Sequence, residues 1–251
     1  MFAVIGGSGL SQLENLNVTR REIIRTPYGD PSSAVLFGDM AGYPVAFLAR
    51  HGHAHTIPPH EINYRANIKA LSQAGVSGIV SVASVGSIHH GLTPGDIVIP
   101  HQIIDYTWGR KSTYFEGRGA TVKHVDFTEP YDKKLRCRLL EAAHAAGIRV
   151  RDFAVYAATQ GPRLETAAEI DRFEKDGANV VGMTGMPEAI LARELDIPYA
   201  AINVVANYAA GRADSRDGIR FELTPDILRE SMKQIRTLIE KALEHDSQSR
   251  S

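Results

Sequence analysis

Several features that would place a protein in a specialised class are missing from this sequence. Its 251 residues carry a formal net charge of −1, so no basic field favours nucleic acid or a membrane surface as a partner. No apolar stretch approaches the ~18 residues that are needed to span a bilayer. The start of the chain, Met1 to Gly6, lacks the basic lead of a signal peptide. We therefore expect neither nucleic acid nor a membrane as a partner.

Cysteine is equally scarce. The single residue, Cys137, excludes an internal disulfide and, with no export signal, fits a reducing cytoplasm. It lies in a helical pattern without an adjacent base, so we expect a structural thiol rather than a reactive one. The chain also lacks repeats, internal linkers and the lysine of a Walker loop. It lacks the dinucleotide-binding glycine fingerprint as well, and this absence argues against a dinucleotide-dependent oxidoreductase.

What the sequence does have is the composition and periodicity of a globular protein. Apolar residues make up 43% and charged residues 23%, and the length allows one large domain or two small ones. Strand-length apolar runs occur at residues 2–5, 34–37, 45–49, 78–85, 96–104, 153–158, 179–183 and 199–205. Helical patterns occur at residues 63–74, 131–146, 165–176, 187–195 and 225–244.

This alternation predicts an α/β fold, a sandwich around a mixed sheet, in a single domain over residues 1–244. Several runs are continuously apolar, as strands covered on both faces are. Residues 106–125 and 208–223 are polar and contain glycine, and loops of that length tend to be functional. We expect the tail, residues 245–251, to be disordered.

Polar or Gly-rich segments follow six of the predicted strands. After the first strand, a Gly-Gly-Ser-Gly segment offers backbone amides and the Ser8 hydroxyl to an anion. Arg50 follows the third strand, and its planar fork suits a phosphate. Small residues around Ser84 permit a ligand to approach the backbone closely, Thr184 adds a hydroxyl, and Asn207 can donate and accept at once.

Each of these segments has a plain structural alternative. The glycines around Ser8 fit a simple tight turn, and the small residues near Ser84 fit close packing. Glu188 is a candidate partner for a helix dipole, and Asn207 a turn former. The alternating histidines His51, His53 and His55 do not favour a metal site, because no carboxylate or cysteine joins them at ligand spacing and Arg50 would repel a cation.

The segment 153–166 carries the clearest chemical signal. A strand-like apolar run ends at Gly161 and Pro162, and Leu164 and Glu165 follow where a helix is predicted to begin. In open α/β sheets, small molecules bind at such strand ends. A carboxylate can accept a hydrogen bond from a neutral N–H, and an apolar neighbour can cover a flat ring. Together the six segments supply groups for a phosphate, a sugar and a nucleobase.

Over nearly its whole length the sequence resembles the nucleoside phosphorylase superfamily, in particular its trimeric purine nucleoside and 5′-methylthioadenosine phosphorylase branch. The motifs that carry the resemblance occur in the family's order. They are Arg50-His51-Gly52, Asn63-Tyr64-Arg65-Ala66-Asn67-Ile68, Pro94-Gly95-Asp96-Ile97-Val98, Gly161-Pro162-Arg163 and Pro187-Glu188. The resemblance implies a three-layer α/β/α sandwich around a mixed twisted sheet, an enzyme that needs no metal or organic cofactor, and a homotrimer with sites near subunit interfaces.

The resemblance also implies roles for individual residues. The phosphate site falls on Ser8, Arg50, His51, Ser84 and Thr184. Met183 lies against the ribose, and Leu164 covers the base, where many relatives have an aromatic residue. The catalytic residues would be Asn207, His51 and Arg50.

Two positions bear on the base. Methylthioadenosine phosphorylases usually have an aspartate where this chain has Asn207, whereas 6-oxopurine enzymes pair a glutamate, here Glu165, with an asparagine. A carboxylate accepts from N1–H of hypoxanthine or guanine, and adenine has no proton on N1. Leaving such a buried group unpaired costs about 1–3 kcal/mol. The pair therefore favours a 6-oxopurine.

The sugar end resembles the methylthio enzymes. Where 6-oxopurine enzymes commonly have a histidine for the 5′-hydroxyl, this chain has Pro225 and Leu228, which predict an apolar pocket. Its other wall would be His124 of a neighbouring subunit. The combination favours 5′-methylthioinosine and phosphate as substrates. The alternatives are 5′-methylthioadenosine, inosine or guanosine as the nucleoside, or a non-catalytic nucleotide-binding module.

Overall fold

The computed structural model describes residues 1–8, 10, 13–117, 119–220 and 224–248. Within these residues, eleven strands form one mixed sheet. The strands are β1 (Phe2–Gly6), β2 (Asn17–Glu22), β3 (Val35–Met40), β4 (Tyr43–Ala49), β5 (Ile79–Ser87), β6 (Ile97–Val98), β7 (Gln102–Asp105), β8 (Val150–Arg151), β9 (Val155–Ala158), β10 (Val180–Gly182) and β11 (Tyr199–Tyr208). The helices are α1 (Tyr64–Gln73), α2 (Lys133–Ala145), α3 (Ala167–Lys175), α4 (Gly185–Glu194), α5 (Thr224–Gln248) and a short 3₁₀ turn, η1 (Ala213–Ser215).

Strand β5 organises the sheet. Strand β11 runs parallel to it along one edge, from Ile79 to Ser87. On the other edge, β1 is parallel to the first half of β5, and β10 is antiparallel to its last two residues. β4 continues the parallel part beside β1, and β9 and β7 continue beside β10. Two sets of strands therefore approach the middle of β5 from opposite directions.

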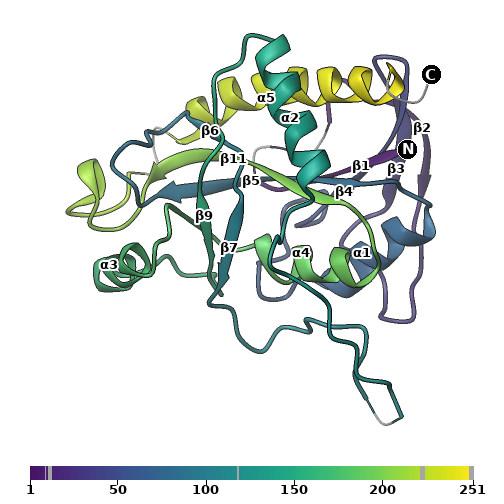
Figure 1. Cartoon of the computed structure of the whole chain (residues 1–251), viewed down its shortest axis with the longest axis horizontal. Coiled ribbons are helices and arrows are strands. Elements are labelled where there is room, and N and C mark those ends of the chain that lie inside the picture. Colours follow the sequence, from purple (N-terminus) through teal and green to yellow (C-terminus); the bar gives the residue numbers. More distant parts are fainter. Residues whose placement is uncertain (9, 11–12, 118, 221–223, 249–251) are drawn as a thin grey trace.

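Helices cover both faces of this sheet, so the predicted three-layer α/β/α sandwich is confirmed (Figure 1). α2 and α5 lie on one face, and α1 and α4 lie on the other. Successive β1 side chains alternate between the two cores. Ala3 and Ile5 pack in the α1/α4 core with Leu71, while Phe2 and Val4 pack in the α2/α5 core with Leu139.

Local hydrogen bonds set the helix starts. Asn63 caps α1 by accepting from the Ala66 amide, and Asp132 caps α2 by accepting from the Leu135 amide. Thr166 and Glu169 form a reciprocal capping box at the start of α3. The predicted start at Glu165 was therefore two residues early, and Glu165 lies outside the helix.

Two further differences from the prediction have a clear physical cause, and the extended ends of β11 and α5 add two more differences. The predicted strand at 96–104 is broken into β6 and β7 around Pro100, which has no amide to donate. β2 was missed because all its side chains are exposed, so it carries no apolar pattern. β11 continues past Val205 through a bulge to Tyr208, and α5 continues past Glu244 to Gln248. The rest of the predicted tail, 249–251, lies outside the described residues.

Three further predictions concern Cys137, the long loop before α2 and the absence of a membrane-spanning segment. Cys137 lies on α2 as predicted, but its side chain is exposed, so a structural role by packing is wrong. Residues 106–132 contain no helix or strand among those described, and they extend away from the sheet in Figure 1. Among the described helices, none has both the length and the apolar character that crossing a membrane requires.

Candidate active site

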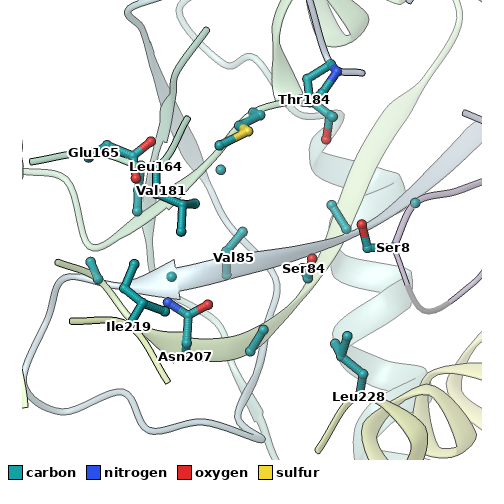
Figure 2. A pocket seen from close by; sticks show the side chains of 18 of the residues that line it. Ser8, Ser84, Val85, Leu164, Glu165, Val181, Thr184, Asn207, Ile219 and Leu228 are labelled. Atoms are coloured by element: carbon teal, nitrogen blue, oxygen red, sulfur yellow. The ribbon is translucent and has the colours of Figure 1, made fainter. Parts of the chain in front are cut away.

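A cavity of about 280 Å³ lies where the two sets of strands converge on β5 (Figure 2). Ten of the twelve residues that the sequence assigned to the site line it. They are Ser8, Arg50, His51, Ser84, Leu164, Glu165, Met183, Thr184, Asn207 and Leu228. β10 arrives antiparallel to β5, so the site is not a row of strand ends along one edge. Residues within β5, from Ala83 to Gly86, and the segment that follows β10, with Met183 and Thr184, line the cavity instead.

The Gly-rich segment after β1 lies against Arg50. A side chain at Gly7 would put its Cβ 2.6 Å from Arg50 Nη1, so only glycine allows this approach. The Gly7 amide donates to the Val82 carbonyl at 3.0 Å and anchors the turn to β5. In Figure 2 the Ser8, Ser84 and Thr184 side chains lie towards one end of the cavity, away from Glu165 and Asn207.

Arg50 is fully buried, and most of its donors are occupied. Nε and Nη2 donate to the two carboxylate oxygens of Glu188 at 2.8 and 2.9 Å. Nη2 also donates to Ser81 Oγ at 2.6 Å, and Nη1 donates to the Val82 carbonyl at 3.0 Å. Of the five guanidinium N–H groups, one on Nη1 is left. The planar fork therefore binds Glu188, and the predicted fork-like grip on phosphate is wrong.

Glu188, from the first turn of α4, is the centre of a buried network. Its side chain is fully buried, and its Oε1 also accepts from the Tyr199 hydroxyl at 2.8 Å. Burial by itself would lower the pKa of Arg50, but the charge and hydrogen bonds of Glu188 outweigh it and raise that pKa. Burial and the Glu188 charge likewise raise the pKa of Tyr199. Glu188 is thus a buried ion-pair partner that the helix-dipole alternative did not anticipate.

His51 is neutral near pH 7. Its Nδ1 lies 2.8 Å from the Ile57 carbonyl, which can only accept, so Nδ1 carries the proton. Burial and the adjacent Arg50 lower the pKa of His51 to about 4. Its Nε2 is consequently a hydrogen-bond acceptor. Among the described residues, no group of three or more His, Cys, Asp or Glu side chains could hold a metal ion.

Thr184 is held in place by a residue that the sequence did not reveal. The fully buried Tyr156 accepts from the Thr184 amide at 3.3 Å. Its hydroxyl also occupies the space where a side chain at Gly182 would lie, so that position requires glycine. An apolar strand run gave no sign that Tyr156 has this contact.

The opposite end of the cavity holds the predicted base-recognition residues. Glu165 Oε1 accepts from Thr159 Oγ1 at 2.7 Å, which leaves Oε2 for a ligand. Asn207 Nδ2 donates one hydrogen to the Tyr208 carbonyl at 2.7 Å. Figure 2 shows the two side chains on facing walls of the same cavity. Seven apolar lining residues were missed: Pro59, Ala83, Val85, Val181, Ala206, Ala209 and Ile219. None of them carries a side-chain group that would mark a ligand site in the sequence.

Two predicted residues lie elsewhere. Pro225 is exposed and does not line the cavity, so only Leu228 of α5 reaches it. His124 is exposed in the long loop and does not line the cavity of its own chain. The prediction that His124 serves a neighbouring subunit's site stays a prediction.

The comparisons with known proteins find nucleoside phosphorylases. A protein of Pseudomonas syringae pv. tomato, named as a probable S-methyl-5′-thioinosine phosphorylase, is 49% identical over 97% of this chain and 98% of its own. The 6-oxopurine nucleoside phosphorylase of Pyrococcus furiosus is 47% identical over 86% of this chain and 82% of its own. The solved structure of methylthioadenosine phosphorylase from Schistosoma mansoni in complex with adenine superposes with a TM-score of 0.92 at 29% identity, covering 98% of this chain and 91% of that one.

The family model described as the phosphorylase superfamily matches residues 1–244. The chain therefore belongs to the phosphorylase superfamily and is an enzyme of the nucleoside phosphorylase type, as the sequence predicts.

Proposed function

We propose that the protein catalyses the reversible phosphorolysis of 6-oxopurine nucleosides, with 5′-methylthioinosine preferred. The reaction converts this nucleoside and phosphate into hypoxanthine and 5-methylthioribose 1-phosphate. The observation that carries the proposal is that Glu165 and Asn207 line one cavity together with the hydroxyls of Ser8, Ser84 and Thr184. Relatives named for 5′-methylthioinosine and for 6-oxopurine nucleosides support it.

The base end selects the purine. Glu165 Oε2 accepts from N1–H of hypoxanthine, while Thr159 holds the other carboxylate oxygen. Asn207 keeps a second amide hydrogen, because the Tyr208 carbonyl takes only one. That hydrogen is donated to purine N7. Val85, Val181 and Leu164 supply apolar surface for the ring faces.

The charges and hydrogen-bonding groups of the lining residues determine how phosphate would bind. Arg50 offers one N–H from a guanidinium whose charge Glu188 largely offsets. Neutral His51 accepts from the proton of monohydrogen phosphate through Nε2. The hydroxyls of Ser8, Ser84 and Thr184 donate the remaining hydrogen bonds.

Catalysis then combines alignment with charge stabilisation. The glycosidic bond stretches first and leaves positive charge on the ribosyl group, which the phosphate opposite stabilises. The purine leaves as an anion, and the Asn207 amide stabilises the charge that develops at N7. Glu165 keeps the ring in register. We propose a cytoplasmic homotrimer in which His124 of a second subunit completes the 5′ pocket beside Leu228.

The second candidate substrate is 5′-methylthioadenosine. The solved methylthioadenosine phosphorylase structure favours it, and the apolar Leu228 suits the methylthio group of either nucleoside. A panel of 5′-methylthioinosine, 5′-methylthioadenosine and inosine at saturating phosphate separates the candidates by base release. We expect the highest kcat/KM for 5′-methylthioinosine. A higher value for 5′-methylthioadenosine would refute the base assignment, and a higher value for inosine would refute the assignment of the sugar end.

A further inference from the structure

Arg110 lies outside the cavity but contacts three of its walls. It belongs to the long loop between β7 and α2, and its side chain is half-buried. Its five N–H groups make six hydrogen bonds, so one N–H of Nη1 is shared between two acceptors, and all the acceptors are neutral oxygen atoms. None of the roles assigned above uses this residue.

The first wall is the segment that carries Glu165. Arg110 Nη2 donates to the carbonyls of Thr159 and Gln160 at 3.2 and 2.7 Å. Nε donates to Gln160 Oε1 at 3.2 Å. Thr159 is also the residue whose hydroxyl holds the Glu165 carboxylate. Arg110 thus fixes the backbone directly behind the base-binding carboxylate.

The second wall is the segment that carries Met183 and Thr184. Arg110 Nη1 donates to the carbonyls of Met183 and Met186 at 2.8 and 2.6 Å. These carbonyls flank Thr184, the hydroxyl assigned to phosphate. One planar group therefore holds the base segment on Nη2 and the phosphate segment on Nη1.

The third wall is reached through Tyr64. Arg110 Nη1 donates to the Tyr64 hydroxyl at 3.1 Å, and the guanidinium lies 5.3 Å from the centre of the Tyr64 ring. The Tyr64 hydroxyl donates in turn to the carbonyl of Pro59, which lines the cavity, at 2.9 Å. Tyr64 is itself buried, so this link is rigid.

We propose that Arg110 is a positioning residue that sets the separation between the base-binding and phosphate-binding segments. The inference rests on the proposed function. Its geometry needs a guanidinium, because the donors of a single rigid plane reach acceptors on two segments. A lysine ammonium keeps the charge but is one point on a flexible stem, so it cannot hold both segments.

The expected kinetic effect follows from what each segment retains. Without Arg110, Glu165 keeps Thr159, and Thr184 keeps Tyr156. Each substrate still binds, so both KM values should change less than about fivefold. The two segments lose their common support, and a misplacement of about 1 Å between reactants costs about 100-fold in rate. We expect kcat per folded enzyme to fall by about that factor.

The test compares the full-length enzyme with Arg110→Ala, Arg110→Lys and Lys111→Ala. Lys111 is a matched control, because it is the neighbouring cation and its side chain reaches Glu116 on the surface. Circular dichroism gives the folded fraction of each variant, and nucleoside and phosphate are titrated separately. A wild-type enzyme that releases no base from any nucleoside refutes the proposed function, whereas the role of Arg110 is decided by the variants alone.

We expect both Arg110 variants to lose kcat while Lys111→Ala keeps it. Free guanidinium should recover at least about tenfold of the loss in Arg110→Ala, and urea at the same concentration should not. If Arg110→Ala does not fold, Arg110→Lys decides. Wild-type kcat in Arg110→Lys, an equal loss in Lys111→Ala, or a loss that appears only in KM would each overturn the proposal.

Discussion

Replacing Asn207 by aspartate should move the base preference towards 6-aminopurines. In the wild-type enzyme the Asn207 amide donates to the Tyr208 carbonyl at 2.7 Å and has a second hydrogen for N7. A carboxyl group at this half-buried position faces the Tyr208 carbonyl, which favours its protonated form. It then has a single proton to share between Tyr208 and N7, and the oxygen that replaces Nδ2 accepts from a 6-amino group.

The size of the shift follows from the pairing at position 6 of the purine. With a 6-oxopurine, the introduced carboxyl oxygen meets a carbonyl, and an unpaired buried acceptor costs about 1–3 kcal/mol. This corresponds to about 5- to 150-fold in kcat/KM. With a 6-aminopurine, the same oxygen gains a donor. We expect the ratio of kcat/KM for 5′-methylthioinosine to that for 5′-methylthioadenosine to fall at least about tenfold.

The assay measures base release from both nucleosides at saturating phosphate. Asn17→Asp is the control, because it makes the same substitution on the exposed strand β2, far from the cavity. It should leave the ratio unchanged. A ratio in Asn207→Asp within about twofold of the wild type would refute the role given to Asn207.

Three further changes test the phosphate end. Gly7→Ala should raise the phosphate KM at least about tenfold, because the added Cβ would lie 2.6 Å from Arg50 Nη1. Phosphate titration at saturating nucleoside measures this KM, and an unchanged value would contradict the prediction. Glu188→Gln should lower the free energy of unfolding by about 3–5 kcal/mol, because it leaves the Arg50 charge buried without a counter-charge. Urea unfolding measures this free energy, and a loss below about 1 kcal/mol would contradict the prediction. Burial and the adjacent Arg50 lower the pKa of His51 from its ordinary value of 6.5 to about 4 in the folded state. The unfolded chain therefore binds the extra proton between these values, and stability should fall as pH drops from about 6.5 to 4. His51→Gln should flatten that slope, and an identical slope would refute the assignment.

Much of the fold could be predicted because its strands are continuously apolar. The runs around β1, β4, β5 and β11 are buried on both faces, and they have the strand pattern that such burial requires. β2 could not be found this way, since its exposed side chains include two arginines and a glutamate. Pro100 divides an apolar run whose composition alone favours one strand.

The lining of the site could be predicted better than the contacts that shape it. Glycine, hydroxyl and amide residues after strands indicate a ligand site at the sequence level. The partner of Arg50 could not be inferred in this way, because Glu188 lies 138 positions away in the chain. Arg110 gave no signal either, since four of its six acceptors are backbone carbonyls, which every residue has. Such partners depend on tertiary structure and leave no local pattern.

The most direct test of the central claim is a crystal structure of the enzyme with hypoxanthine and phosphate. We predict that Glu165 Oε2 lies about 3 Å from N1 of the purine, that the Asn207 amide lies within hydrogen-bond reach of N7, and that phosphate binds the hydroxyls of Ser8, Ser84 and Thr184. A purine bound with its N1 edge away from Glu165, or a phosphate outside the Ser8 end of the cavity, would contradict it.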